Sequence, residues 1–289
     1  MAARPVGLLH PGEMGSAVAA TLQNAGNAVH WVSEGRSPRS RQRAEELWLI
    51  DARTIARLSS QCPAIVSVCP PEFADDVANC VLVSGFRGLF IDANAISPTR
   101  VEAMGRRMTE GGVEFVDASI IGLATREPGR VWIYFSGDRA SEAAALFGSA
   151  GPLQADAISG PIGRASALKM CYAGFNKGSA ALLCATLAAA EGLGVRDLLT
   201  RQWALSDREM SGAEKKAGRV AAKAWRFTAE MREIAETFEA AGATPEFHRA
   251  AEEVYAQLLG FKDQETPDLD EILRALTGGL AKACGTRPT

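Results

Sequence analysis

The chain has 289 residues, of which 47% are hydrophobic and 22% are charged. This length exceeds the usual single-domain size, so two domains are expected, and the composition excludes a disordered chain. The 31 basic and 34 acidic residues give a net charge of −3, which argues against a dedicated nucleic-acid binder. Only three histidines are present, so neither a His-rich metal site nor a Ser-His-Asp triad is expected. Of the 31 basic residues 24 are arginine, and the first lysine is Lys169.

The six cysteines form no C-x-x-C pair, and most of them lie in apolar runs. This usage predicts a reduced protein in which the cysteines are small core residues. The N-terminus lacks the basic and long apolar segments of a signal peptide. The uncharged apolar run at 179–190 is too short to span a bilayer and predicts a buried helix. We therefore expect a cytoplasmic protein that has no membrane partner.

In the first 160 residues, short apolar runs alternate with amphipathic stretches. This alternation is typical of a parallel sheet built from βαβ units, because each crossover between parallel strands needs a helix. The strands are predicted at 5–10, 28–33, 64–70, 88–93, 114–120 and 131–137, and the helices at 15–26, 40–49, 75–83 and 98–110.

After about Gly160 the strand pattern stops, and helical patterns fill the rest of the chain. The sequence therefore predicts an α/β protein with a Rossmann-type domain at 1–160 and an all-α domain at 161–289, joined by a long helix. The helices are predicted at 164–193, 195–206, 214–241, 245–259 and 269–283.

The first strand runs into the glycine-rich turn G-L-L-H-P-G-E-M-G at 7–15. Gly12 and Gly15 occupy the second and third glycine positions of the dinucleotide fingerprint G-x-G-x-x-G, where backbone approaches a pyrophosphate at a helix N-terminus. His10 occupies the first position, so the fingerprint is incomplete. The strand before it, the helix after it and a second strand ending about 20 residues on favour dinucleotide binding over an unrelated glycine turn.

The second strand ends in S-E-G-R-S, and this segment bears on the choice of cofactor. NAD-binding proteins place Asp or Glu at this strand end to bond the ribose 2′-hydroxyl. Ser33 holds that position here, and Arg36 with Ser37 can hold a 2′-phosphate by charge-assisted hydrogen bonds. Glu34 could still serve a ribose. We expect NADP as the cofactor, with NAD the less favoured alternative.

Five motifs occur in order along nearly the whole chain: G-L-L-H-P-G-E-M-G, V-S-V-C-P-P, I-D-A-N-A-I-S-P, F-V-D-A-S-I-I-G and G-P-I-G-R-A-S-A-L-K. In this order and spacing the chain resembles the β-hydroxyacid dehydrogenase superfamily, which includes 3-hydroxyisobutyrate dehydrogenases, 6-phosphogluconate dehydrogenases and the related imine reductases. It looks most like a poorly characterised, phosphogluconate-dehydrogenase-like branch. The resemblance implies a cytoplasmic oxidoreductase that binds a nicotinamide cofactor and a small-molecule substrate.

The resemblance places the superfamily's catalytic lysine at Lys169. Hydride transfer to a carbonyl leaves negative charge on oxygen, which a cation or acid at that place stabilises. Tyr172 and Asn176 follow at i+3 and i+7, so they share a helical face with Lys169, although an exposed polar stripe would show the same spacing. The superfamily's asparagine four residues after the lysine is Ala173 here, so Tyr172 or Asn176 is expected to replace it. Lys177 is a further candidate for the cleft in which Lys169 is expected to act.

The remaining site residues are also implied by the resemblance. Ile121 stands where the superfamily has a serine that helps hold a carboxylate, and Glu230 stands where it has a lysine. A plain small hydroxyacid is therefore not the expected substrate. The expected cofactor-binding residues are Gly12, Glu13, Met14, Ser33, Arg36, Ser37, Cys69, Pro70 and Asn94, and the expected substrate-binding residues are Ser119, Ile121, Gly122 and Glu230.

Three functions fit these residues. The first is an NADP-dependent oxidoreductase for a small polar hydroxy or keto compound, with Lys169 as general acid–base. The second is an imine reductase, which Glu230 would suit by attracting a cationic iminium and which Lys169 argues against. The third is an NADP-binding protein without catalytic activity. The resemblance also implies a homodimer in which the helical domains pack together.

Overall fold

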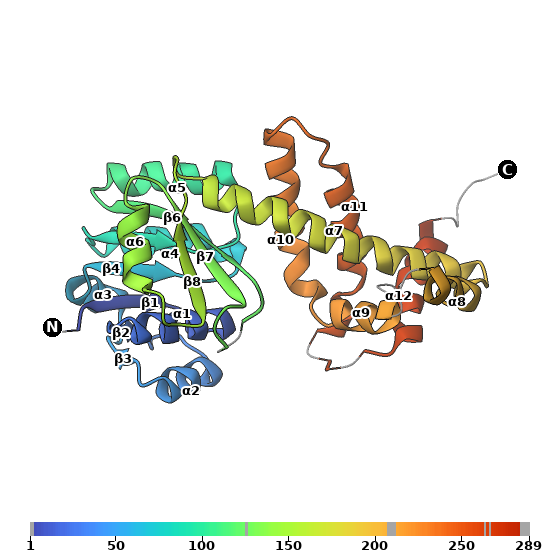
Figure 1. Cartoon of the computed structure of the whole chain (residues 1–289), viewed down its shortest axis with the longest axis horizontal. Coiled ribbons are helices and arrows are strands. Elements are labelled where there is room, and N and C mark those ends of the chain that lie inside the picture. Colours follow the sequence, from blue (N-terminus) through green and yellow to red (C-terminus); the bar gives the residue numbers. More distant parts are fainter. Residues whose placement is uncertain (1–2, 125–126, 207–211, 263, 266, 284–289) are drawn as a thin grey trace. The chain divides into compact units, whose positions relative to one another are not determined.

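The structure is a computed structural model that describes residues 3–124, 127–206, 212–262, 264–265 and 267–283 (Figure 1). It divides into two compact units, Met1–Met170 and Cys171–Thr289. The boundary between the two domains was expected near Gly160. The first unit extends about ten residues beyond it because it includes the first turns of the long helix. No helix of the described residues is long and apolar enough to cross a membrane.

An eight-stranded sheet forms the centre of the N-terminal unit, as far as the structure describes it, in the order β3-β2-β1-β4-β5-β6-β7-β8. Neighbouring strands are parallel except for β6 and β7, which form an antiparallel pair. This mostly parallel sheet confirms the predicted fold class. The strands are β1 (Pro5–Leu9), β2 (Ala28–Trp31), β3 (Ile50–Asp51), β4 (Ala64–Ser67), β5 (Leu89–Asp92), β6 (Glu114–Ile121), β7 (Val131–Ser136) and β8 (Leu153–Ala157).

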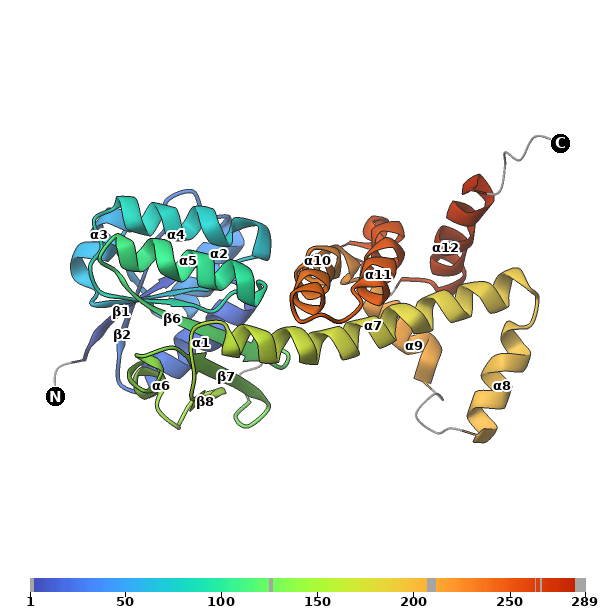
Figure 2. The ribbon, with the colours of Figure 1, turned by 90° about the horizontal axis from the view of Figure 1, so that it is seen from above.

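Helices cover both faces of this sheet, with α3, α4 and α5 on one face and α1 and α6 on the other (Figure 2). Side chains alternate between the two faces along each strand. Phe90 of β5 therefore packs on the face covered by α3, α4 and α5, and Ile91 packs on the face covered by α1 and α6. Strands buried on both faces read as continuous apolar runs. The helices are α1 (Glu13–Asn24), α2 (Pro38–Glu46), α3 (Ile55–Gln61), α4 (Ala74–Val83), α5 (Pro98–Glu110) and α6 (Ala140–Phe147), with a 3₁₀ turn η1 (Pro71–Phe73).

Four elements of this unit were not predicted from the sequence: β3, α3, α6 and β8. Strand β3 has only two residues, both exposed, and so carries no hydrophobic pattern. Helix α6 begins without a side-chain cap, which removes the usual start signal. Strand β8 reads L-Q-A-D-A and is held by pairing with β7 rather than by an apolar run.

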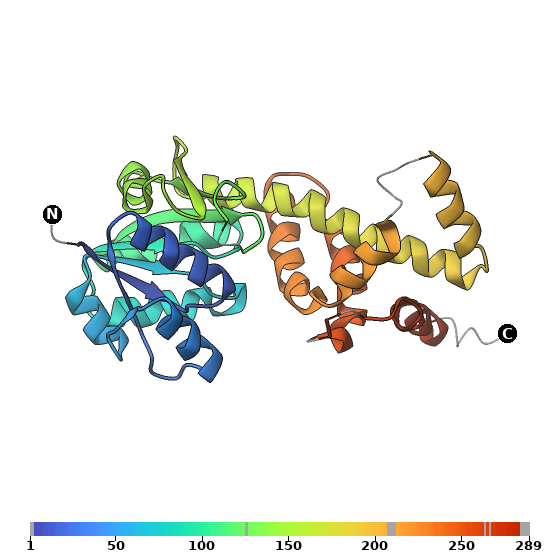
Figure 3. The same cartoon turned by 60° about the horizontal axis from the view of Figure 1, so that its bottom comes forward.

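The C-terminal unit is helical in the residues described. The pattern at 214–241 predicted one helix, but the structure has two, because the chain turns at 222–223, where no glycine or proline marks the break. Helices α10 and α11 pack side by side and antiparallel (Figure 3). The helices are α7 (Arg164–Gly192), which begins in the N-terminal unit, α8 (Arg196–Ser206), α9 (Ala213–Ala221), α10 (Ala224–Ala240), α11 (Glu246–Gln257) and α12 (Leu269–Ala283), with a 3₁₀ turn η3 (Leu259–Phe261).

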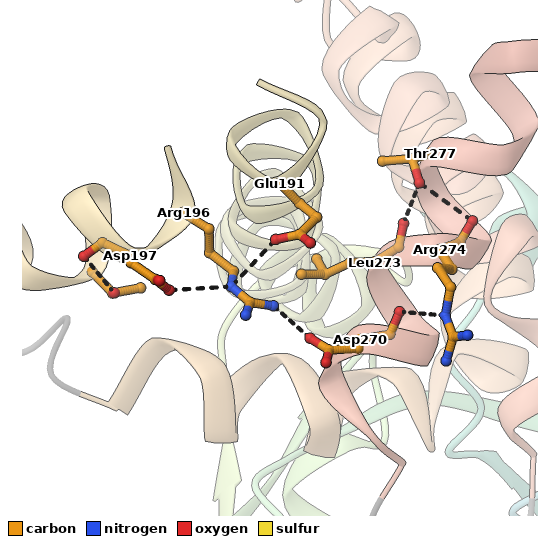
Figure 4. A network of polar contacts seen from close by, with 8 residues as sticks. Glu191, Arg196, Asp197, Asp270, Leu273, Arg274 and Thr277 are labelled. Atoms are coloured by element: carbon orange, nitrogen blue, oxygen red, sulfur yellow. Dashed lines mark hydrogen bonds and ion pairs between the residues drawn. The ribbon is translucent and has the colours of Figure 1, made fainter. Parts of the chain in front are cut away.

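Helix α8 is joined to the rest of this unit through Arg196 at its first position (Figure 4). The guanidinium of Arg196 donates to Asp270 of α12 at 2.6 Å and lies 3.3 Å from the carboxylate of Glu191 on α7. The hydrogen bond to Asp270 is the main reason that the pKa of Arg196 is raised. None of the residues of α8 is buried within the single chain.

Candidate active site

The turn between β1 and α1 contains two glycines with different roles. A Cβ on Gly15 would lie 2.2 Å from the carbonyl oxygen of His10, so only glycine fits where the helix meets the turn. A Cβ on Gly12 would meet nothing within 4 Å, which leaves open space beside the N-terminus of α1. His10 has φ +75°, in the left-handed region. The turn thus has the close helix–strand packing and the open helix N-terminus that a dinucleotide site requires.

Glu13 and Met14 open α1, and both were expected to contact the cofactor. The carboxylate of Glu13 lies 3.9 Å from the guanidinium groups of Arg39 and Arg43 on α2. Met14 is partly buried and packs against the core on the α1 face of the sheet. The side chains of both residues thus contact other residues of the protein.

A cavity of about 440 Å³ lies at the carboxyl edge of the sheet, which is where parallel α/β sheets bind ligands. Its volume falls in the usual range for small-molecule sites. It brings together three predicted cofactor residues: Arg36, Cys69 and Pro70. Its other lining residues were not among the expected cofactor residues; they are Leu9, His10, Ile55, Phe73, Asp76, Val77 and Cys80. Ile55 could not be found because its helix α3 was itself not predicted.

The electrostatics of this cavity are set by Arg36 and His10. Arg36 is half-buried, it forms no ion pair with any described residue, and its Nε has no hydrogen-bond partner there. Burial lowers the pKa of Arg36. Burial, and then the charge of Arg36, lower the pKa of His10 to about 4. Two basic groups therefore lie close together, and Asp76, the carboxylate among the lining residues, is exposed and forms no ion pair with either of them in the described structure. An anion would stabilise this arrangement.

Ser33 and Ser37 shape the loop that carries Arg36. Ser33 is buried, and its carbonyl oxygen accepts a hydrogen bond from Arg41 at 2.7 Å. The Ser37 hydroxyl accepts from the backbone N–H of Ser40 at 3.3 Å and so caps α2. This loop is thus fixed at both ends, and Arg36 lies between them.

Asn94 was expected to contact the cofactor, with a turn or helix cap before Pro98 as the alternative. Its side chain is buried; its Oδ1 accepts from the backbone N–H of Cys69 at 2.6 Å, and its Nδ2 donates to Asp92 at 2.6 Å. Asn94 therefore fixes the loop after β4, which carries Cys69 and Pro70 to the cavity. Burial raises the pKa of Asp92 to about 7, and the charge of Asp117 adds to this effect.

Asp117 organises the start of α7, and the sequence did not single it out. Its buried carboxylate accepts hydrogen bonds from the hydroxyls of Ser166 and Ser136 at 2.7 and 2.9 Å. It also accepts from the backbone N–H groups of Gly163 and Ser166 at 3.0 and 3.1 Å. The only sign of this role in the sequence is an aspartate within an otherwise largely apolar predicted strand. The contacts anchor the N-terminus of α7, where a negative charge is favourable.

Lys169 lies five residues after the first residue of α7, and its ammonium donates to the backbone carbonyl of Ile120 at 2.6 Å. The lysine is thus placed beside the C-terminal end of β6. There, the buried Ser119 hydroxyl has no partner among the described residues, and Ile121 is buried. Gly122 has φ +130°, a conformation that favours glycine. The structure therefore brings Lys169 together with three of the four expected substrate residues.

The other expected residues lie in the C-terminal unit. Tyr172 is exposed, and Asn176 donates to the carbonyl of Tyr172 at 2.9 Å. Lys177 and Glu230 are ion-paired with each other, and both side chains are largely buried. The ammonium of Lys177 also lies 5.2 Å from the centroid of the Phe227 ring. The carboxylate of Glu230 is therefore already neutralised by a cation of its own unit.

The cysteines only partly match the prediction of small core residues. Cys62 and Cys184 are buried, whereas Cys80 and Cys171 are exposed, so the prediction is wrong for these two. Cys284 lies outside the described residues. In the part of the chain that the structure describes, no group of three or more His, Cys, Asp and Glu could hold a metal ion.

Comparison with known proteins bears on both units. Residues 5–147 match the NAD binding domain of 6-phosphogluconate dehydrogenase, and residues 190–258 match a domain of unknown function, DUF1932. The structure of the protein MTH1747, described as similar to 3-hydroxyacid dehydrogenases, is 27% identical, with 89% of this chain and 97% of that chain covered and a TM-score of 0.65. These matches confirm the resemblance of the chain to the β-hydroxyacid dehydrogenase superfamily.

More distant members share the fold. A 3-hydroxyisobutyrate dehydrogenase of Mycobacterium tuberculosis is 19% identical, with 95% of this chain and 99% of that chain covered and a TM-score of 0.68. An imine reductase of Myxococcus stipitatus, solved with NADP⁺, is 15% identical, with 94% and 99% covered and a TM-score of 0.55. No curated protein sequence matches the chain. The N-terminal unit thus matches a known NAD-binding domain, and the solved structures that share the fold include dehydrogenases and reductases.

Proposed function

We propose that the chain is an NADP-dependent oxidoreductase that transfers a hydride between nicotinamide and a small polar hydroxy or keto compound. The observation that carries the choice of NADP is Arg36, a half-buried guanidinium that forms no ion pair with any described residue. It follows β2, where dinucleotide-binding sheets hold the 2′ position of the ribose. A 2′-phosphate would supply its missing anion, whereas a ribose hydroxyl would leave the charge without a partner.

The residues present fit this cofactor. The open N-terminus of α1 at Gly12 suits a pyrophosphate, and the cavity lined by Arg36, Cys69 and Pro70 suits the adenosine end. Ser37 lies next to Arg36 and can add a hydroxyl to the phosphate site. When bound, the nicotinamide supplies or accepts the hydride.

Lys169 supplies the proton that accompanies this hydride. Its ammonium is held at the end of β6 by the Ile120 carbonyl and can donate to the oxygen of a carbonyl being reduced. In the reverse direction the neutral amine accepts the proton of the alcohol. Tyr172 and Asn176 follow on the same helix and are proposed to orient the substrate.

The substrate site differs from that of a plain hydroxyacid dehydrogenase. Ser119 offers a buried hydroxyl without a partner in the described residues, and Ile121 adds an apolar wall in place of the superfamily's serine. A cationic iminium would have to compete with Lys177 for Glu230. This pairing, together with Lys169, favours a carbonyl or alcohol substrate over an imine.

A homodimer is proposed from the exposed apolar surface of the C-terminal unit. Leu198 and Leu205 of α8, together with Leu193 just before it, leave 64%, 76% and 77% of their surfaces exposed. A helix with no buried residue gains little stability from its own chain, so a second copy is the expected cover.

The proposed function is tested by following NADPH absorbance across a panel of keto acids, keto alcohols and cyclic imines. Lys169→Ala should lower turnover of the best substrate by about 100-fold or more, because it removes the proton donor. It should bind NADPH as tightly as the wild type, measured by fluorescence titration. Lys215→Ala, which removes an exposed lysine of α9, is the control and should keep full activity.

The possible results separate the three functions. Near-wild-type turnover in Lys169→Ala would exclude the lysine mechanism. Turnover of cyclic imines alone would replace the proposal with imine reduction. Tight NADPH binding without turnover of any compound would indicate a binding protein.

A further inference from the structure

His10 occupies the first glycine position of the dinucleotide turn in a backbone conformation that suits glycine. Its φ is +75°, and only two other non-glycine residues of the described chain, Trp48 and Arg53, have positive φ. This conformation costs free energy for a residue that has a Cβ, although histidine tolerates it better than most. A residue held in such a conformation at a binding site is a candidate for a functional role of its side chain.

The side chain of His10 lies on the wall of the same cavity as Arg36. Its Nδ1 is buried and has no hydrogen-bond partner among the described residues, as is true of Arg36 Nε. The other titratable lining groups are Cys69, Cys80 and the exposed Asp76, and none of them contributes to the lowered pKa of His10. The imidazole and the guanidinium therefore lie in a cavity whose one acidic lining residue, Asp76, is exposed and forms no ion pair with either of them in the described structure.

We propose that His10 and Arg36 together bind the 2′-phosphate of the cofactor, so that His10 is a specificity-determining residue for NADP over NAD. The inference rests on the proposed function. Its distinguishing feature is that the imidazole lines the same cavity as Arg36, which lies in the loop after β2, at the 2′ position rather than at the pyrophosphate. A phosphate there supplies an acceptor for the two nitrogens without a partner in the described structure, His10 Nδ1 and Arg36 Nε. Its charge also opposes the effect of Arg36 and raises the pKa of His10.

The test measures binding of 2′,5′-ADP and 5′-AMP to the full chain by isothermal titration calorimetry. The two ligands differ only in the 2′-phosphate and lack nicotinamide, so the result is independent of catalysis by Lys169. The wild type should prefer 2′,5′-ADP. His10→Gly should reduce this preference by about tenfold, the size of one lost charge-assisted hydrogen bond, and Arg36→Ala should reduce it further. The affinity for 5′-AMP should change little in either variant.

Two further variants separate phosphate recognition from backbone strain. Trp48→Gly relieves the strain of another positive φ, at an exposed residue just before β3 at the amino edge of the sheet, and should keep the wild-type preference. His10→Asn keeps a side chain that tolerates this backbone but cannot take up a proton, and it should also lose preference. Retained 5′-AMP binding shows that each variant is folded.

The outcomes distinguish the inference from the function on which it rests. If His10→Gly keeps the wild-type preference while Arg36→Ala loses it, NADP stands and the role of His10 is overturned. If the wild type shows no preference for 2′,5′-ADP, both the NADP proposal and the role of His10 are overturned. If neither nucleotide binds, the cavity is not a dinucleotide site.

Discussion

At the scale of single residues, two acids share the carboxyl edge of the sheet. Asp92 and Asp117 are paired in register on neighbouring parallel strands, so their side chains lie on the same face. Asp117 receives four hydrogen bonds, whereas Asp92 accepts from Asn94 and its Oδ2 has no partner in the described structure. Burial, assisted by the charge of Asp117, therefore raises the pKa of Asp92 to about 7.

This raised pKa predicts a pH dependence of stability. The folded state holds a proton on Asp92 between about pH 4 and 7 that the unfolded chain releases, so stability is lost as the pH rises through this window. Asp92→Asn keeps an oxygen for Asn94 and carries no charge. We expect it to raise the Tm by a few degrees at pH 8, with the gain shrinking toward pH 4. Calorimetric scans across this range check it, with the exposed Asp138→Asn as control. An equal gain at every pH would contradict this account.

At the scale of elements, the start of α7 determines the position of Lys169, the proposed catalytic lysine. The carboxylate of Asp117 on β6 caps the helix, and Lys169, one to two turns further along it, bonds back to β6 at Ile120. The strand and the helix are therefore joined at two points, at residues 163–166 and at Lys169 of the helix. A cap residue from a strand is a long-range contact that fixes a helix start without any local capping motif.

Removing this cap should destabilise the N-terminal unit. Asp117→Ala leaves two hydroxyls and two backbone N–H groups without their buried acceptor, which should cost about 2–4 kcal/mol of unfolding free energy. Asp117→Asn should cost less, since one oxygen remains. Urea unfolding monitored by circular dichroism measures both. Glu110→Gln, at the exposed last residue of α5, is the control and should change the unfolding free energy by less than about 0.5 kcal/mol. Equal stability of wild type and Asp117→Ala would show that α7 does not depend on this cap.

At the scale of the whole molecule, the exposed leucines of α8 predict assembly. Val195, Leu198, Leu199 and Leu205 line a shallow depression with Arg201 and Gln202, on a helix that buries none of its residues in the single chain. Arg196 holds the start of this helix to α7 and α12 through Glu191 and Asp270, so the apolar side chains are presented on an anchored support.

Light scattering at micromolar concentration should give twice the 30.6 kDa mass of one chain. Leu198→Glu with Leu205→Glu should give the monomer mass, because two buried carboxylates would oppose the interface. Gln257→Glu with Gln264→Glu adds the same charge at exposed positions of the same unit and should leave the dimer intact. A wild type of monomer mass would refute the proposed homodimer.

The sequence by itself determined the fold class, the dinucleotide turn and the superfamily. These follow from local patterns: strand and helix periodicity, the glycine spacing at Gly12 and Gly15, and the order of five motifs. The bounds of α5 were predicted to the residue because Pro98 starts the helix and Gly111 follows it.

The tertiary structure decided what no local pattern carries. It paired Glu230 with Lys177, so the acid that was expected to bind the substrate is neutralised by a lysine of its own unit. It joined Asn94, an expected cofactor residue, to the loop after β4 by a hydrogen bond from the Cys69 backbone. It also placed His10 and Arg36 in the same cavity, where their charges interact. Each of these contacts joins residues about 25 or more positions apart. Periodicity and propensity act over one or two turns of chain, whereas such contacts arise only when the sheet order and the helix packing bring distant segments together.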